Sequence, residues 1–441
     1  MPKIRVPPKL YYSKKSFEDT VDPRVVSVFE LKQYKQRTKG WYKARGKCIT
    51  ASSASSTMLQ SEDSCGAYID YYNLRDNFKI DPKKTCSHKE TQMEFILNKC
   101  GLGPDFKGNE YTAWGQKYEQ IVSNIYSQIH QVDMLEFGLI RHPTIDFLGA
   151  SPDGITTQGR MLEIKCPPCR QVKNYPPLYY WQQMQLQLIC TNLQECDYFD
   201  AHFVQYVVRE DWENDARQWE LDNKDAKHHI YGIILSYPSS GDSDSEVESD
   251  SDVSDDEMEQ TEQDDAEDDV GADDVGADDA GDANVDVSAD EPIKEEEKYI
   301  PPNYIYAEPN IVKVDEFIQW MDETIEKGKS EGREITPVFY KLHEYYISRA
   351  EVNHEWFAKN LPSMKAVWEQ VLEGRTKKGK AVLIDYVKNK SDALADKRAK
   401  KKAQKEANAN LEVYIDLDIT GAQETYTKTG RSTYVHKTCL L

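Results

Sequence analysis

The feature that most constrains the fold is a predicted β-hairpin with charged residues at its end. An apolar strand is expected over Ile145–Ser151, a turn over Thr156–Gly159 and a returning strand over Met161–Lys165. Side chains alternate between the two faces of a strand, so Glu163 and Lys165 should project to the same side. The pattern therefore predicts a sheet that presents a carboxylate beside an ammonium group.

A second carboxylate lies at the bend next to this hairpin. Asp153 stands between Pro152 and Gly154, which break regular strand pairing, and Glu163 follows ten residues later. Both carboxylates can therefore converge on one cation, and the backbone carbonyl of Ile164 is a candidate third ligand. Mg²⁺ prefers oxygen ligands and keeps several waters, and Mn²⁺ is the alternative ion.

This arrangement of charges is typical of a metal-dependent phosphodiesterase. Lys165 would hold or deprotonate the attacking water, while the metal stabilises the charge that develops on the phosphate. A Glu-x-Lys pattern on a strand is more often a solvated ion pair. Here, however, a Met-Leu pair precedes Glu163 and Cys-Pro-Pro follows Lys165, which indicates a buried strand end.

A basic, hydroxyl-rich segment lies upstream. Arg45 is followed by Thr50 and Ser52 at the predicted start of a helix. Helix amides, hydroxyls and a guanidinium together suit a phosphate group. The simpler interpretation is that Thr50 or Ser52 is an N-cap, and the two roles are compatible.

Two further predicted helices carry polar residues. Trp114 opens the first helix, in which Glu119 either compensates the helix dipole or serves as a further metal or water ligand. The second helix begins near Tyr179 and is rich in glutamine, with Gln183 and Gln187 on one face. Such amides can orient a water or contact a phosphate, but ordinary polar surface would explain them as well.

Together these four segments resemble the YqaJ-type viral recombinase exonucleases, the group that includes the phage lambda exonuclease, within the PD-(D/E)xK nuclease superfamily. The order is W-x3-R-x4-TAS, then G-x3-E, then SPDG-x8-EIKCP, then Y-x2-Q-x-Q. The resemblance runs from about Trp41 to about Asn192. The chain looks closest to relatives in large DNA viruses of eukaryotes, often called alkaline nucleases.

The resemblance implies an α/β restriction-endonuclease-like core, with a mixed central sheet flanked by helices. It also implies a set of site residues. These are Asp153 and Glu163 as Mg²⁺ ligands, Lys165 as the catalytic lysine, Glu119 as an additional acidic residue at the metal, Gln183 near the attacking water, and Arg45, Ser52 and Ser151 around a 5′-phosphate.

The implied activity is processive 5′→3′ digestion of one strand of duplex DNA, leaving a 3′ overhang for strand annealing. The expected partners are double-stranded DNA ends and a single-strand annealing or ssDNA-binding protein, and the oligomeric state stays open. One alternative is an endonuclease or junction resolvase on the same core. Another is a non-catalytic DNA-binding protein, although the complete Asp-Glu-Lys set argues against it.

The net charge of −22 comes from one segment. Residues 241–298 hold 27 Asp and Glu but only two Lys, and the rest of the chain has 53 basic and 50 acidic residues. Such a segment cannot bury enough apolar surface to fold, so we expect a disordered acidic insertion. We therefore expect a first part of the nuclease domain at 1–240, the insertion at 241–298, a closing part at 299–375 and a basic tail at 376–441.

The closing part and the tail have their own patterns. We expect short strands at 304–306 and 311–314, helices at 314–327 and 338–372, and strand-like segments at 411–417 and 425–435. Basic clusters at 375–380 and 397–402 suit phosphate contact along DNA, nuclear import or a plain solvated face. No signal peptide or membrane span is visible, so we expect an intracellular protein, in the host nucleus or cytoplasm, with no membrane partner.

Overall fold

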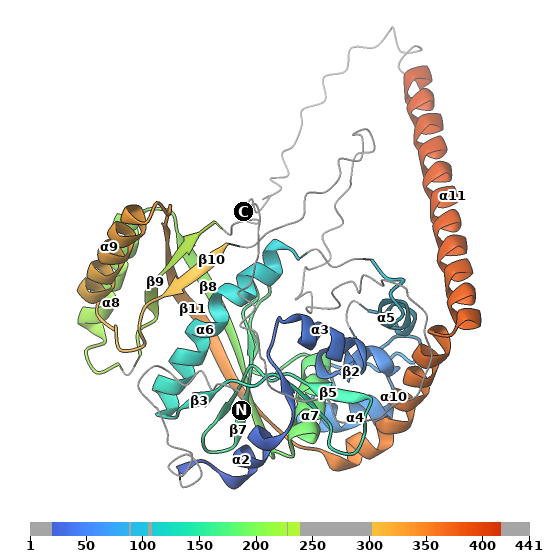
Figure 1. Ribbon diagram of the computed structural model, residues 1–441. Helices are drawn as coiled ribbons and strands as arrows, with labels where there is room; N and C mark the ends of the chain where they lie inside the picture. Colours follow the sequence, from blue (N-terminus) through green and yellow to red (C-terminus); the bar gives the residue numbers. More distant parts are fainter. Residues whose placement is uncertain (1–19, 88–89, 105–107, 227, 239–301, 416–441) are drawn as a thin grey trace. The chain divides into compact units, whose positions relative to one another are not determined.

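The computed structural model describes residues 20–87, 90–104, 108–226, 228–238 and 302–415 (Figure 1). The acidic segment at 241–298 and the strand predicted at 425–435 lie outside these residues. The chain divides into two compact units, Met1–Glu369 and Gln370–Leu441.

Two sheets form the framework of the first unit. The larger sheet has the order β10-β9-β11-β8-β7-β6-β3, with β7 and β8 parallel and the other neighbours antiparallel. Its strands are β3 (Met134–Leu135), β6 (Gly154–Thr156), β7 (Arg160–Lys165), β8 (Glu195–Tyr206), β9 (Tyr231–Tyr237), β10 (Asn303–Tyr306) and β11 (Thr336–Glu351). The smaller sheet has the order β1-β4-β5-β2, formed by β1 (Gln33–Tyr34), β4 (Leu139–Arg141), β5 (Leu148–Ala150) and β2 (Ile49–Thr50). The predicted α/β class with a mixed sheet is confirmed.

Helices cover both faces of β7. Leu162 and Ile164 pack against α6 (Glu110–His130) in one apolar core. The alternate residue Glu163 faces α7 (Leu178–Thr191) on the other side, where it meets two glutamines. The period of two along a strand thus sends apolar side chains to one helix and the charged ones to the other.

The predicted hairpin exists, but its first strand differs from the expectation. β7 pairs with β6, whereas Leu148–Ala150 forms β5 in the smaller sheet. Pro152, which has no N–H to donate, and the bend at Asp153 separate the two strands. The chain therefore crosses from one sheet to the other at the residue expected to bind metal.

The helix predicted from residue 338 was wrong in its first half. Residues 336–351 form β11, which is rich in aromatic and β-branched residues and pairs with β8 on one side and β9 on the other. Helix α10 (His354–Gly374) begins only after this strand. Residues 311–313 form no strand, and Val314 is the first residue of α9 (Val314–Ser330). The strand at 304–306 and the helix from residue 314 are confirmed.

The segments on either side of the acidic tract belong to one sheet. Tyr237, the last residue of β9, lies directly opposite Asn303, the first residue of β10. β11 lies between β8 and β9, so strands from both sides of the tract alternate across the sheet. Helices α8 (Arg209–Asp222) and α9 lie side by side over this end, around a core that contains Trp212 and Phe317 (Figure 1).

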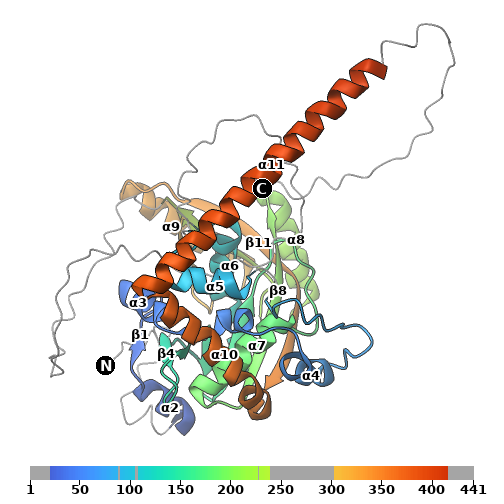
Figure 2. The same ribbon diagram turned by 90° about the vertical axis from the view of Figure 1, so that its right-hand side faces the viewer.

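The first part of α10 packs on the helices around the site (Figure 2). Trp356 contacts Trp181 of α7 and donates a hydrogen bond from Nε1 to the Ser64 carbonyl of α4 (Glu62–Tyr71). Among its described residues, the first unit also contains α2 (Pro23–Glu30), α3 (Lys39–Gly46) and α5 (Gln92–Lys99), with a 3-10 turn, η1, at Ala51–Thr57.

The second unit contains the helix α11 (Lys377–Ile415), which bears the basic cluster at 397–402 and most of the one at 375–380. Its described lysines and arginines are exposed. The strand predicted at 411–417 was wrong over residues 411–415, which continue the helix. Among the described residues, no helix has the length and apolar character needed to cross a membrane.

Candidate active site

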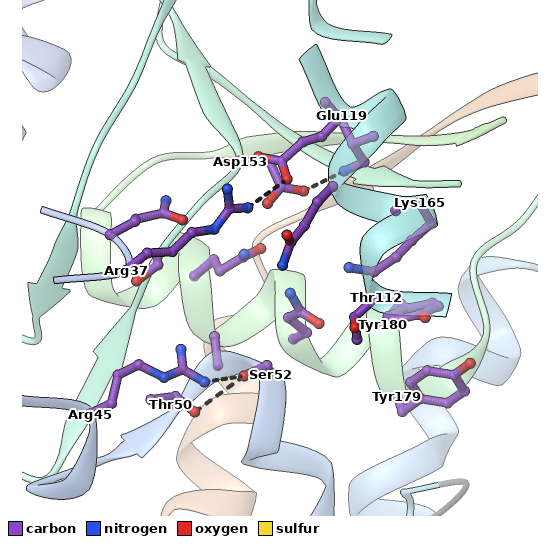
Figure 3. Close-up of a pocket in the computed structure, with 18 of the residues that line it drawn as sticks. Arg37, Arg45, Thr50, Ser52, Thr112, Glu119, Asp153, Lys165, Tyr179 and Tyr180 are labelled. Atoms are coloured by element: carbon purple, nitrogen blue, oxygen red, sulfur yellow. Dashed lines mark hydrogen bonds and ion pairs between the residues drawn. The ribbon is translucent and has the colours of Figure 1, made fainter. Parts of the chain in front are cut away.

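A pocket of about 340 Å³ brings the predicted site residues together (Figure 3). Its wall includes Arg45 of α3, Ser52 of η1, Glu119 of α6, Ser151 and Asp153 after β5, Ile164 and Lys165 of β7, and Gln183 of α7. Glu163 has no exposed surface and lies beneath the wall. Residues more than a hundred positions apart in sequence thus share one cavity.

Asp153 is held by the edge of β7. Its Oδ2 accepts a hydrogen bond of 2.7 Å from the Ile164 amide. Burial, and then the negative charge of Glu163, raise the pKa of Asp153 well above its ordinary value. The N–H and C=O of one strand residue leave the same edge of the strand, so the Ile164 carbonyl also projects toward the Asp153 side.

Three donors converge on Glu163. Its Oε1 lies 2.7 Å from the Lys165 Nζ and accepts a hydrogen bond of 2.6 Å from the Gln183 Nε2. Its Oε2 accepts a hydrogen bond of 2.7 Å from the Gln187 Nε2. Both glutamines are buried, so the interpretation of this helix as ordinary polar surface was wrong.

Lys165 is placed by its neighbours as well as by Glu163. Its ammonium lies 4.7 Å from the centre of the Tyr180 ring, a favourable cation–π geometry. In the sheet, Lys165 pairs with Asp200 of β8, whose carboxylate makes a two-pronged contact with Arg170, with both distances 2.7 Å. Arg170 thereby neutralises Asp200, the buried acid of β8 that lies opposite Lys165.

Glu119 lies in the third turn of α6, because the helix begins at Glu110 rather than at Trp114. The helix dipole acts within the first turn, so dipole compensation does not explain this residue. Its Oε2 accepts from the Arg37 Nη2 at 3.3 Å. Arg37 has a left-handed backbone (φ 66°), and Figure 3 shows its side chain reaching across the pocket. No sequence pattern indicated this residue, because its place depends on an unusual backbone angle.

Arg45 lies at the other end of the pocket and is almost completely buried. Its Nη2 donates to the Ser52 hydroxyl at 3.4 Å, and its guanidinium lies 4.3 Å from the centre of the Trp41 ring. The Trp41 Nε1 in turn donates to the Ser151 hydroxyl at 3.1 Å. Thr50 occupies the N-cap position of η1, as one interpretation expected, but its side chain makes no capping hydrogen bond to the backbone.

The sequence of this part of the chain matches a described family. Residues 40–194 match the YqaJ-like viral recombinase domain. The match covers the segment in which the site residues were predicted. It contains all eight predicted polar site residues and the Ile164 carbonyl.

Individual proteins are similar to parts of the chain. An uncharacterized protein of Acanthamoeba polyphaga mimivirus is 31% identical over 227 residues, which is 47% of this chain and 36% of the relative. The chain therefore spans about a third of the length of that curated relative.

Solved structures are similar over a smaller part. A crystal structure of an alkaline exonuclease from Laribacter hongkongensis has 26% identity and a TM-score of 0.27, over 37% of this chain and 74% of that one. A phage-related exonuclease from Haemophilus somnus has 13% identity and a TM-score of 0.24, over 35% and 68% of the two chains.

The donor set of the pocket fits a hard divalent cation. No group of three or more His, Cys, Asp or Glu side chains among the described residues is arranged to hold a metal. Mg²⁺ commonly takes only one or two carboxylates and completes its shell with water. Asp153, Glu163 and the Ile164 carbonyl supply such a set, and a cation would offset the carboxylate repulsion that raises the pKa of Asp153.

Proposed function

We propose that this chain is a divalent-cation-dependent exonuclease that digests one strand of duplex DNA from its 5′ end. The product would be a 3′ overhang, suited to recombination or end processing. The observation that carries the proposal is that Asp153 and Lys165 lie on the wall of one pocket that also contains Arg45, with Glu163 directly beneath that wall in contact with Lys165. The match to a viral recombinase domain supports the same class of chemistry.

The catalytic roles follow from the contacts. Mg²⁺, or Mn²⁺ in its place, would be held by Asp153, Glu163 and the Ile164 carbonyl and would stabilise negative charge on the phosphate. Lys165 would hold and orient the attacking water, because its ammonium is fixed beside Glu163. It would take the proton of that water only as the neutral amine. Gln183 would hold the same water through its amide.

The remaining polar residues would bind and position the DNA. Arg45, with the Ser52 and Ser151 hydroxyls, would hold the 5′-phosphate, since a guanidinium with hydroxyl donors is a strong phosphate site. Glu119 would complete the acidic side of the pocket, as a ligand of the cation or of its water. The preference for chain ends would arise because the phosphate site and the carboxylates lie in different parts of one pocket.

We further propose that the acidic segment is an insertion within one nuclease domain, which closes with residues 299–375. The pairing of β9 with β10 supports this organisation, since the two strands that flank the segment are sheet neighbours. The exposed basic clusters of α11 would contact DNA phosphates or direct nuclear import. A single-strand annealing protein remains the partner that the 3′ product would serve.

Digestion of linear and closed circular duplex DNA tests the proposal. Wild type in Mg²⁺ should degrade the linear form and leave the circle intact, and Lys165→Ala should lose the activity. The exposed Lys329 offers a matched control, so Lys329→Ala should act as wild type does. Cutting of the circle would favour an endonuclease or junction resolvase. Absence of Lys165-dependent cleavage of either substrate would favour a binding protein.

A further inference from the structure

Glu163 is held by three donors that all border the pocket but differ in exposed surface. Lys165 and Gln183 both contact Oε1, and their side chains keep some exposed surface. Gln187 alone contacts Oε2, and it has no exposed surface at all. The two oxygens of the carboxylate are therefore held by side chains that differ in exposed surface.

The contacts on Oε1 are the ones that catalysis would break. In the proposed mechanism Lys165 and Gln183 turn toward the attacking water, and each then gives up part of its contact with Glu163. Gln187 borders the same pocket, but its side chain has no exposed surface and its amide is already turned to Oε2, away from the contacts on Oε1. Its hydrogen bond is the one that can persist throughout the reaction.

The buried amide of Gln187 lowers the stability of the folded protein. Its Oε1 is buried and has no hydrogen-bond partner among the described residues. A buried polar atom without a partner typically costs on the order of 1–3 kcal/mol, and an apolar side chain would not carry that cost. A neutral donor has one advantage over Arg or Lys here, because it orients the carboxylate without cancelling the charge that attracts a cation.

We propose that Gln187 is the positioning residue that fixes Glu163 for cation binding. The inference rests on the proposed function, since it concerns the same cation. Residues that orient a metal ligand typically contribute about 10–100-fold to metal affinity. Loss of the Gln187 amide should therefore weaken the cation site, whereas loss of Gln183 should mainly lower the rate of the chemical step.

Mn²⁺ binding to the full chain without DNA, followed by electron paramagnetic resonance, tests this role. The 27 acidic residues at 241–298 will add weak sites in every variant. The site of interest is therefore defined as the binding that Asp153→Asn removes. Gln187→Met should weaken that component about tenfold or more, and the shorter amide of Gln187→Asn should weaken it too.

Gln185 on the same helix provides a matched control. It is equally buried, but it bonds to the backbone of Glu351 and Asn353 instead of the site. Gln185→Met should lower the free energy of unfolding and leave the Mn²⁺ component unchanged. Wild-type affinity in Gln187→Met would overturn the inference and leave the proposed function standing. Identical Mn²⁺ binding in wild type and Asp153→Asn would overturn both.

Discussion

Replacement of Trp356 should show that the residues after the acidic tract stabilise the domain that contains the site. The side chain is 1% exposed and packs edge-on against Trp181, with ring centres 5.4 Å apart. Its Nε1 donates to the Ser64 carbonyl at 3.0 Å, and that carbonyl also accepts from the Gln182 Nε2 at 2.9 Å. Loss of the indole N–H therefore leaves no unsatisfied acceptor.

Two substitutions separate the hydrogen bond from the packing. Trp356→Phe loses one hydrogen bond and keeps most of the ring contact, so it should cost about 0.5–1.5 kcal/mol of unfolding free energy. Trp356→Ala also opens a cavity between α4, α7 and α10, and should cost roughly 3–5 kcal/mol.

Urea unfolding followed by tryptophan fluorescence and by circular dichroism measures both costs. The exposed Lys359 lies on the same helix and pairs only with Glu355 among the described contacts, so Lys359→Ala should leave the unfolding free energy nearly unchanged. If Trp356→Ala were as stable as wild type, the packing of α10 on the site helices would be refuted. Equal costs for the Phe and Ala variants would refute the separation of the two effects.

Three further predictions concern charge. Because burial and Glu163 raise the pKa of Asp153, the folded protein keeps this proton to higher pH than the unfolded chain, and its stability falls as pH rises above about 4. Asp153→Asn should therefore be more stable than wild type without cation, by a margin that grows with pH in thermal melts over that window. Arg45→Met should erase the preference for 5′-phosphorylated over 5′-hydroxyl ends in initial rates, while Arg75→Met, at an exposed site outside the pocket, should retain it. Deletion of 242–297 should raise DNA affinity at low salt if the acidic tract competes with DNA, and unchanged affinity in a fluorescence-anisotropy titration would exclude that competition.

Most of the residues predicted for the site line one pocket, and several of them lie close to local signals in the sequence. Pro152 and Gly154 mark the bend at Asp153, and alternation along β7 places Glu163 beside Lys165. The motifs also identified Arg45, although its contact with the Trp41 ring was not foreseen.

The main error in the fold concerns β11, where local propensity left the choice between helix and strand open. Its sixteen residues are a strand because β8 and β9 pair with them from both sides, and such non-local pairing leaves no local pattern. The burial of the glutamines of α7 could not be predicted for a similar reason. Only the approach of Glu163 from another element shows that Gln183 and Gln187 are buried donors and not surface residues.

The most direct test of the central claim is the polarity of digestion. Linear duplex DNA would carry a label at the 5′ or the 3′ end and either a phosphate or a hydroxyl at the 5′ end, and it would be incubated in Mg²⁺ or in EDTA. We expect early release of the 5′ label as mononucleotide, faster from phosphorylated ends, with retention of the 3′ label, no reaction in EDTA and none with Lys165→Ala. Early release of the 3′ label, or digestion that persists in EDTA or without Lys165, would contradict the account.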